Sequence, residues 1–151
     1  MGPASNMAAI GVDGGGTRCR FALRLHGRRF DVTLGSANAT SDMGATIETL
    51  KQGLRALTRE ADVAPETISN VPAFVGLAGV TDRTIAAELT RSLPLSNVWI
   101  EDDRRTAMVG ALGAADGCVM GIGTGSFFGR RAEGDERLIG GWGLVLGDDA
   151  S

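Results

Sequence analysis

The rest of the fold depends on the stretch Gly11-Val12-Asp13-Gly14-Gly15-Gly16-Thr17-Arg18, which lies between two apolar runs, residues 7–10 and 19–25. Apolar runs on both sides of a glycine cluster predict a strand, a tight turn and a second strand. Glycine has no Cβ, so the turn can take left-handed φ values and come close to a ligand. The N–H groups of such a turn can converge into an anion-binding concavity.

Two polar residues flank the glycines and favour phosphate as the anion. Thr17 adds a hydroxyl donor, and Asp13 has the oxygen ligands that hold a hydrated Mg²⁺ beside bound phosphates. A flexible, glycine-rich hairpin tip is the alternative, so the phosphate hypothesis needs partner motifs elsewhere in the chain. The phosphate hypothesis predicts that Asp13 contacts a magnesium ion through water. The residues that it predicts to bind phosphate are Gly14, Gly15, Gly16 and Thr17.

Composition places the chain among ordinary globular proteins. The 151 residues are 43% hydrophobic and 22% charged, which suits one full domain or two small lobes. A net charge of −3 argues against a nucleic-acid or membrane partner, and the sequence has no apolar run long enough to cross a membrane. Cys19 and Cys118 lack metal-ligand spacing and are expected to be reduced core thiols of a cytoplasmic protein.

Hydrophobic periodicity predicts a β-β-β-α-β-α-β-α order for the first part of the chain. The predicted strands are residues 8–13, 18–25, 29–34, 71–77 and 97–100, and the predicted helices are residues 42–61, 81–93 and 104–115. Thr81 is the expected cap of the second helix. The stretch Gly76-Leu77-Ala78-Gly79 ends a buried strand with small residues, where a backbone or a ligand must approach closely.

A second lobe is predicted to begin at Asp116, after a lobe of residues 7–115 and a disordered leader of residues 1–6. A strand at 118–122, a glycine turn and a strand at 127–131 repeat the opening pattern, and a short strand follows at 137–139. A meander without covering helices cannot bury its open face, so we expect residues 116–151 to be the start of a truncated lobe. The turn residues expected to bind phosphate are Gly123, Thr124, Gly125 and Ser126.

Asp103 is the candidate general base. It follows a predicted parallel strand, and the carboxyl ends of such strands gather at one sheet edge, which places Asp103 near Asp13. Phosphoryl transfer needs positioned phosphates, a metal and a carboxylate that receives the proton of the attacking hydroxyl. An N-cap role before Arg104 is the structural alternative. Asn38 offers amide donors and an acceptor to a sugar hydroxyl, with a turn or helix-entry cap as its alternative.

These motifs together resemble the N-acetylglucosamine and glucosamine kinases of the sugar-kinase, heat-shock-70 and actin superfamily, which also holds the benzoyl-CoA reductase activase-type ATPases. The resemblance spans Ile10 to Ser151 and includes both glycine turns. It also includes Ile100-Glu101-Asp102-Asp103, where the family usually has Asn-Asp at the last two positions. It implies an α/β fold with a ribonuclease-H-like, actin-like ATPase lobe followed by the first strands of a similar lobe.

The same resemblance implies a sugar pocket. The motifs Gly140-Gly141-Trp142-Gly143 and Gly147-Asp148-Asp149-Ala150-Ser151 are similar to the family's sugar-pocket signatures, although Asp149-Ala150 replaces the usual Glu-Gly. The sugar-binding residues that it implies are Asn38, Asp103, Gly141, Trp142 and Asp148. The family's adenosine-binding segment lies beyond Ser151, and an intact member would be about twice this length.

The implied activity is transfer of the γ-phosphate of Mg-ATP to the 6-hydroxyl of an amino sugar, with Asp103 as base. One alternative is a conformational ATPase like the activators of benzoyl-CoA reductase and 2-hydroxyacyl-CoA dehydratase. A second is a non-catalytic sugar-binding module, and a third is a nuclease that pairs Asp13 with Asp103 around metals. The sequence leaves open which amino sugar is used, whether the chain is active alone, and whether it forms a homodimer.

Overall fold

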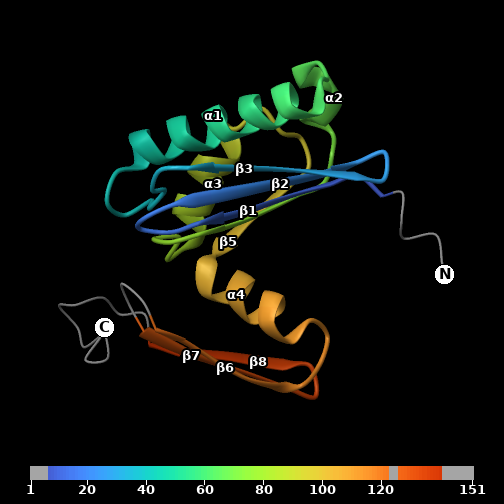
Figure 1. The fold of residues 1–151 in the computed structure, drawn as a ribbon. Coiled ribbons are helices and arrows are strands. Elements are labelled where there is room, and N and C mark those ends of the chain that lie inside the picture. The colour runs from blue at the N-terminus through green and yellow to red at the C-terminus, as the bar shows by residue number, and fades with distance from the viewer. Residues whose placement is uncertain (1–6, 123–125, 141–151) are drawn as a thin grey trace. The chain divides into compact units, whose positions relative to one another are not determined.

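The computed structural model describes residues 7–122 and 126–140, and the chain divides into two compact units, residues 1–103 and 104–151. The division falls directly after Asp103, the first residue of a helix, whereas the sequence places the second lobe after that helix. The order of elements in the first unit is the predicted one, with a short helix at residues 65–69 between the first long helix and the fourth strand (Figure 1).

A five-stranded mixed sheet forms the first unit, in the order β3-β2-β1-β4-β5. Its strands are β1 (Ala9–Gly14), β2 (Cys19–Leu25), β3 (Arg28–Leu34), β4 (Ala73–Leu77) and β5 (Val98–Asp102). Strands β1, β2 and β3 pair antiparallel, whereas β4 is parallel to β1 and β5 is parallel to β4. The chain leaves β1, β3, β4 and β5 at the same end of the sheet. Figure 1 shows the β1–β2 turn and the loops after β3 and β4 gathered there.

Helices α1 (Met43–Ala61), α2 (Pro65–Ser69) and α3 (Arg83–Ser92) connect these strands. Right-handed crossovers place α1 and α3 on one face of the sheet. This face carries the buried residues Ile10 and Val12 of β1, whereas the alternate residues Ala9, Gly11 and Asp13 are exposed. The buried Phe21 ring packs against α1 at Gly53, where a Cβ would lie 2.1 Å from the ring. A glycine inside this helix therefore admits an aromatic ring of the core.

Aspartate side chains cap both long helices of the first unit. Asp42 accepts a hydrogen bond from the Ala45 N–H, and Asp82 accepts from the N–H groups of Thr84 and Ile85. The predicted cap at Thr81 is therefore wrong by one residue. The carboxylate of Asp82 satisfies two of the N–H groups that a helix start leaves without partners.

The second unit combines α4 (Asp103–Leu112) with the antiparallel strands β6 (Gly117–Ile122), β7 (Ser126–Ala132) and β8 (Asp135–Gly140), in the order β6-β7-β8. Met108 of α4 is fully buried, and its sulfur would lie 3.2 Å from a Cβ placed on Gly129 of β7. Glycine at position 129 thus lets the helix approach the sheet closely. The strands of this sheet agree with the predicted ones, and the turn predicted at 123–125 lies outside the described residues.

The other face of the second unit's sheet is open in the described part of the chain. Its exposed large apolar side chains are Met120, Ile122, Phe128 and Ile139. Cys118 lies on β6, on the same face of the sheet as Met120 and Ile122, and it is exposed. Its predicted core position is therefore wrong. Cys19 is buried as predicted, and burial together with the charge of Asp13 raises its pKa to about 12.

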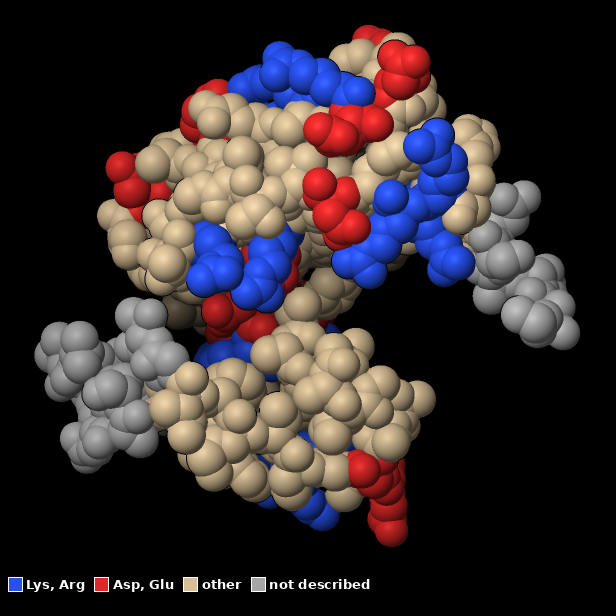
Figure 2. Space-filling model, viewed as in Figure 1, with Lys and Arg blue, Asp and Glu red and all other residues tan. Residues whose placement is uncertain are grey.

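Charged side chains of both signs are mixed over the surface in view (Figure 2). The hairpin between β2 and β3 carries several arginines, but Arg29 is paired with Asp31 at 2.7 Å and Arg28 lies over the ring of Phe30. Paired and stacked arginines of this kind belong to a solvated surface rather than to a continuous basic track. Among the described helices, none is long and apolar enough to span a membrane.

Candidate active site

The first candidate site lies at the sheet edge where β1, β4 and β5 end. Asp13 is in register with Gly76 of β4, which is in register with Glu101 of β5. Adjacent strands lie about 4.8 Å apart, so Asp13 and Glu101 are separated by about 10 Å across this edge. Asp103 follows two residues after Glu101, at the start of α4. Both predicted acidic residues therefore lie at one edge of the first unit's sheet.

The glycines of the first turn have different structural roles. Gly14 is buried, and a Cβ there would lie 2.3 Å from Leu77 Cδ2, so packing requires a glycine. Gly15 donates its N–H to the Arg18 carbonyl at 3.0 Å, which closes the turn. None of these turn glycines has the left-handed φ that the sequence suggests.

Gly16 and Thr17 are the exposed part of this turn. A Cβ on Gly16 would meet no atom within 4 Å, so the backbone there faces open space. Within the described residues, no acceptor is recorded for the N–H of Gly16 or Thr17 or for the Thr17 hydroxyl. These three donors are the part of the turn that can contact an anion.

Asp13 is exposed beside this turn. Its carboxylate contacts Arg20 Nη1 at 3.4 Å, and 52% of its side chain is accessible to solvent. Such an exposed pair contributes at most about 1 kcal/mol, so an incoming cation can displace it. The described residues contain no cluster of three His, Cys, Asp or Glu side chains that could hold a metal. A single carboxylate nevertheless fits Mg²⁺, which keeps several waters and takes other ligands from substrate phosphates.

Asn38 lies in the loop between β3 and α1. Its Oδ1 accepts hydrogen bonds from Thr40 N at 3.1 Å, Thr40 Oγ1 at 2.8 Å and Ser41 N at 3.3 Å. The turn role considered for Asn38 is therefore present, whereas the helix cap is Asp42. Sequence reasoning missed Thr40, because a threonine two residues after an asparagine carries no distinctive pattern.

Backbone hydrogen bonds join this loop to the two neighbouring connections. Ala37 N donates to the Gly15 carbonyl at 3.0 Å, and Ala39 N donates to the Ala78 carbonyl at 3.0 Å. Gly79 has φ +81°, and a Cβ there would lie 2.4 Å from Asn38 Oδ1. The close approach predicted at the end of β4 is therefore confirmed, and the group that approaches is the Asn38 loop.

Asp103 is half-buried at the first turn of α4. The unpaired N–H groups at a helix start favour a carboxylate there.

The remaining predicted contacts belong mostly to residues outside the described part of the chain. These are Gly123, Thr124 and Gly125 of the second turn and the sugar-pocket residues Gly141, Trp142 and Asp148. Ser126 begins β7 in the second unit.

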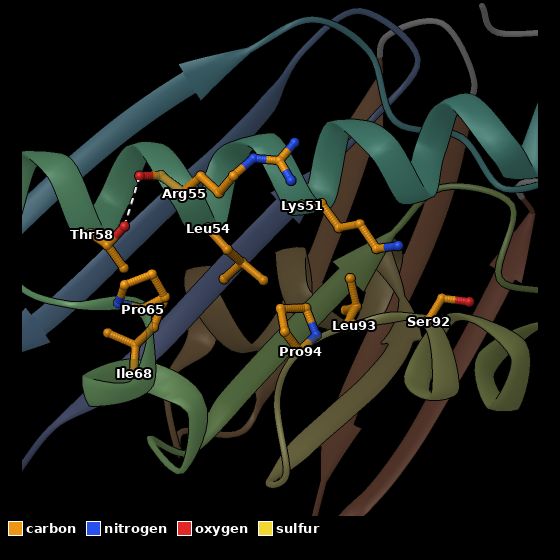
Figure 3. Close-up of a pocket in the computed structure, with 9 residues that line it drawn as sticks. All are labelled: Lys51, Leu54, Arg55, Thr58, Pro65, Ile68, Ser92, Leu93 and Pro94. Carbon is orange, nitrogen blue, oxygen red and sulfur yellow. Dashed lines mark hydrogen bonds between the residues drawn. The ribbon is translucent and has the colours of Figure 1, made fainter.

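A cavity of about 390 Å³ lies away from this edge, between α1, α2 and the segment after α3 (Figure 3). Leu54, Ile68 and Leu93 supply buried apolar walls, and the Thr58 hydroxyl is turned onto the Arg55 carbonyl at 2.8 Å. Its lining contains no carboxylate and none of the glycine turns. This cavity therefore contains none of the groups predicted to hold phosphate or to act as a base.

The sequence profile of the BadF/BadG/BcrA/BcrD ATPase family matches residues 10–151. The chain belongs to this family. It is 29% identical to an N-acetylmuramic acid/N-acetylglucosamine kinase of Clostridium acetobutylicum, covering 94% of this chain and 48% of that protein. It is 23% identical to glucosamine kinase GspK of Vibrio cholerae, covering 94% of this chain and 49% of that protein. The BadF/BadG/BcrA/BcrD chain thus spans about half the length of these curated relatives.

Two solved structures have the same fold as this chain. A Chromobacterium violaceum protein described as a candidate N-acetylglucosamine kinase superposes with a TM-score of 0.79 at 27% identity, covering 95% of this chain and 52% of that one. The ethanolamine utilization protein EutJ of Carboxydothermus hydrogenoformans shares the fold with a TM-score of 0.63 at 16% identity, covering 96% and 56%. The predicted actin-like α/β fold is confirmed.

Proposed function

We propose that the protein transfers the γ-phosphate of ATP to the 6-hydroxyl of an amino sugar, either N-acetylglucosamine or glucosamine. The observation that carries this proposal is the register that brings Asp13 and Asp103 to one sheet edge beside an exposed glycine turn. Kinship with proteins named as N-acetylglucosamine and glucosamine kinases supports the choice of acceptor.

Asp103 is the general base in this proposal. A half-buried carboxylate can accept the proton of a sugar hydroxyl as that oxygen attacks phosphorus. A carboxylate is also a favoured residue at a helix start. The alternative role of Asp103 as a helix-start residue is therefore compatible with catalysis.

The first glycine turn holds the nucleotide's phosphates in this proposal. Gly16 N–H, Thr17 N–H and the Thr17 hydroxyl donate to phosphate oxygens, while Gly14 and Gly15 shape the turn that carries them. Asp13 orients a hydrated Mg²⁺ through its waters, and the ion supplies charge neutralisation when bound. Residues 123–126 give the second set of donors.

The sugar contacts come from Asn38 and Asp103 in the first unit, and from Gly141, Trp142 and Asp148. Amide and carboxylate groups suit hydroxyl ligands because they offer donors and acceptors in fixed directions. Binding that closes the lobes would exclude water from the transferred phosphate.

A conformational ATPase is the second candidate, favoured by the family whose profile the chain matches. Such a protein would hydrolyse ATP at a rate independent of any sugar. A non-catalytic sugar-binding module would instead bind an amino sugar without binding ATP.

The deciding experiment measures ADP release by the full-length protein with Mg-ATP alone and with each amino sugar. We expect release to require glucosamine or N-acetylglucosamine and to match the amount of sugar 6-phosphate detected by mass spectrometry. Glucose serves as the control that lacks the 2-amino group. ADP release at the same rate without sugar would contradict the kinase proposal and favour the ATPase.

A further inference from the structure

We propose that Gly79 and Thr40 are positioning residues that fix the Asn38 amide so that its NH2 group, and not its oxygen, is offered to the sugar. This inference rests on the proposed function. It assigns roles to two residues outside the motifs that led to that function.

The orientation of the Asn38 amide follows from its donors. Thr40 N and Ser41 N are backbone N–H groups that can only donate, and they lie 3.1 and 3.3 Å from Asn38 Oδ1. The atom facing them must therefore be the amide oxygen. The Thr40 hydroxyl donates to the same atom at 2.8 Å. An amide oxygen has two lone pairs, so three donors leave it no capacity for a substrate.

The Asn38 NH2 group is left for a ligand. Within the described residues it donates to no recorded protein acceptor, and Asn38 is half-buried rather than fully solvated. The loop that carries it is bonded to the glycine turn through Ala37 N and the Gly15 carbonyl. The Asn38 NH2 group therefore belongs to a loop that is hydrogen-bonded to the turn proposed to hold phosphate. A sugar hydroxyl that binds there must accept the hydrogen bond and direct its own proton elsewhere.

Gly79 is the second support of this arrangement. A Cβ at position 79 would lie 2.4 Å from Asn38 Oδ1 and 2.6 Å from Thr40 N, which are closer than any ordinary contact. The parallel bridge between Asn38 and Ala78 holds the two loops at this separation. An alanine at 79 must push the Asn38 amide away, and its φ of +81° adds backbone strain.

Matched variants separate positioning from general stability. Thr40→Val removes the hydroxyl donor, and Thr67→Val is its control at an exposed threonine of α2. Gly79→Ala is matched by Gly134→Ala, because Gly134 also has φ +81° but no atom within 4 Å of its added Cβ. Steady-state kinetics of the full-length protein give KM for glucosamine or N-acetylglucosamine, KM for ATP and kcat. Thermal unfolding reports stability.

We expect Thr40→Val to raise KM for the sugar about fivefold, the factor of one hydrogen bond, with KM for ATP unchanged. Gly79→Ala should raise KM for the sugar further. Gly134→Ala should lower thermal stability but leave KM for the sugar unchanged. The positioning role is overturned when both variants match their controls in KM for the sugar, or when KM for ATP rises equally. If Gly79→Ala does not fold, the comparison of Thr40→Val with Thr67→Val tests the positioning role by itself. If the unsubstituted protein shows no sugar-dependent turnover, the proposed kinase function fails and the positioning role fails with it. If the unsubstituted protein turns over but the variants match their controls, only the positioning role fails.

Discussion

At the scale of single residues, Gly14 and Gly16 of the first turn differ in what their missing side chains do. Gly14 is a packing residue, because its missing Cβ makes room for Leu77 in the core. Gly16 has open space around it, so the folded chain alone does not require a glycine there. Its absent side chain matters only where a ligand must come close to the backbone.

Alanine substitutions should separate these two roles. We expect Gly14→Ala to lower the free energy of unfolding by about 1–3 kcal/mol through overpacking. Gly16→Ala should change stability by less than about 0.5 kcal/mol, yet raise the Kd for ATP, because its Cβ intrudes on the phosphate face. Urea unfolding and calorimetric titration of ATP measure the two effects. Equal loss of stability in both variants would refute the division of roles.

At the scale of elements, an ion-pair network joins α4, β7 and β8 in the second unit. Glu136 of β8 contacts Arg131 of β7 at 2.6 Å and Arg105 of α4 at 3.1 Å. Arg131 also donates to the Gly113 carbonyl just after α4. The hydrogen bond from Arg131 is the largest cause that lowers the pKa of Glu136 below its usual value, and the charges of Arg105 and Arg131 add to it.

A lowered carboxylate pKa gives this network a defined pH dependence. It stabilises the folded state above the pKa of an unfolded glutamate, and the contribution is lost as pH falls through the lower folded pKa. We expect Glu136→Gln to be less stable than the unsubstituted protein at pH 7, and this difference in stability to close as pH falls through the lowered pKa of folded Glu136. Urea unfolding of both proteins from pH 7 into the acid range measures this difference in stability.

Glu133→Gln is the control for this experiment, since Glu133 is exposed in the adjacent turn. It should match the unsubstituted protein at every pH. A difference in stability for Glu136→Gln that stays constant over the whole acid range in which the protein remains folded would show that the ionised carboxylate does not supply the stability.

Elements of both units could be predicted from the sequence because apolar alternation and helical stripes are local signals. The predicted and observed bounds of β2 and α1 differ by one residue at most. Cys118 was placed in a core because an apolar strand does not reveal which of its faces is covered. The cap at Asp82 was missed because Thr81 is nearly as good a capping residue by type.

The candidate site could be predicted only in part, since its finer features depend on contacts between distant segments. The carboxylates follow strand ends, so their common edge could be inferred from the strand order. The Asn38 amide oxygen with its three donors, and the close approach of Gly79 to it, depend on a loop–loop bridge that no local sequence pattern predicts. The packing role of Gly14 likewise requires knowledge of its neighbour Leu77.

At the scale of the whole molecule, the strand order explains why the residues of the candidate site lie at one edge of the sheet. Parallel β1, β4 and β5 end at one edge, so the residues that follow them meet without any long-range sequence signal. The chain spans about half of its kinase relatives, at 48% and 49% of their lengths. The activity of the whole protein is therefore tested on the full-length form.

Substitution of Asp103 by asparagine tests the central claim most directly, with Asp102→Asn as its matched control on the preceding residue. The account predicts that Asp103→Asn lowers kcat by about 10²–10⁴-fold, the usual contribution of a general base. Calorimetry should show nearly unchanged sugar binding, and Asp102→Asn should keep its activity. Undiminished phosphate transfer in Asp103→Asn would contradict the account.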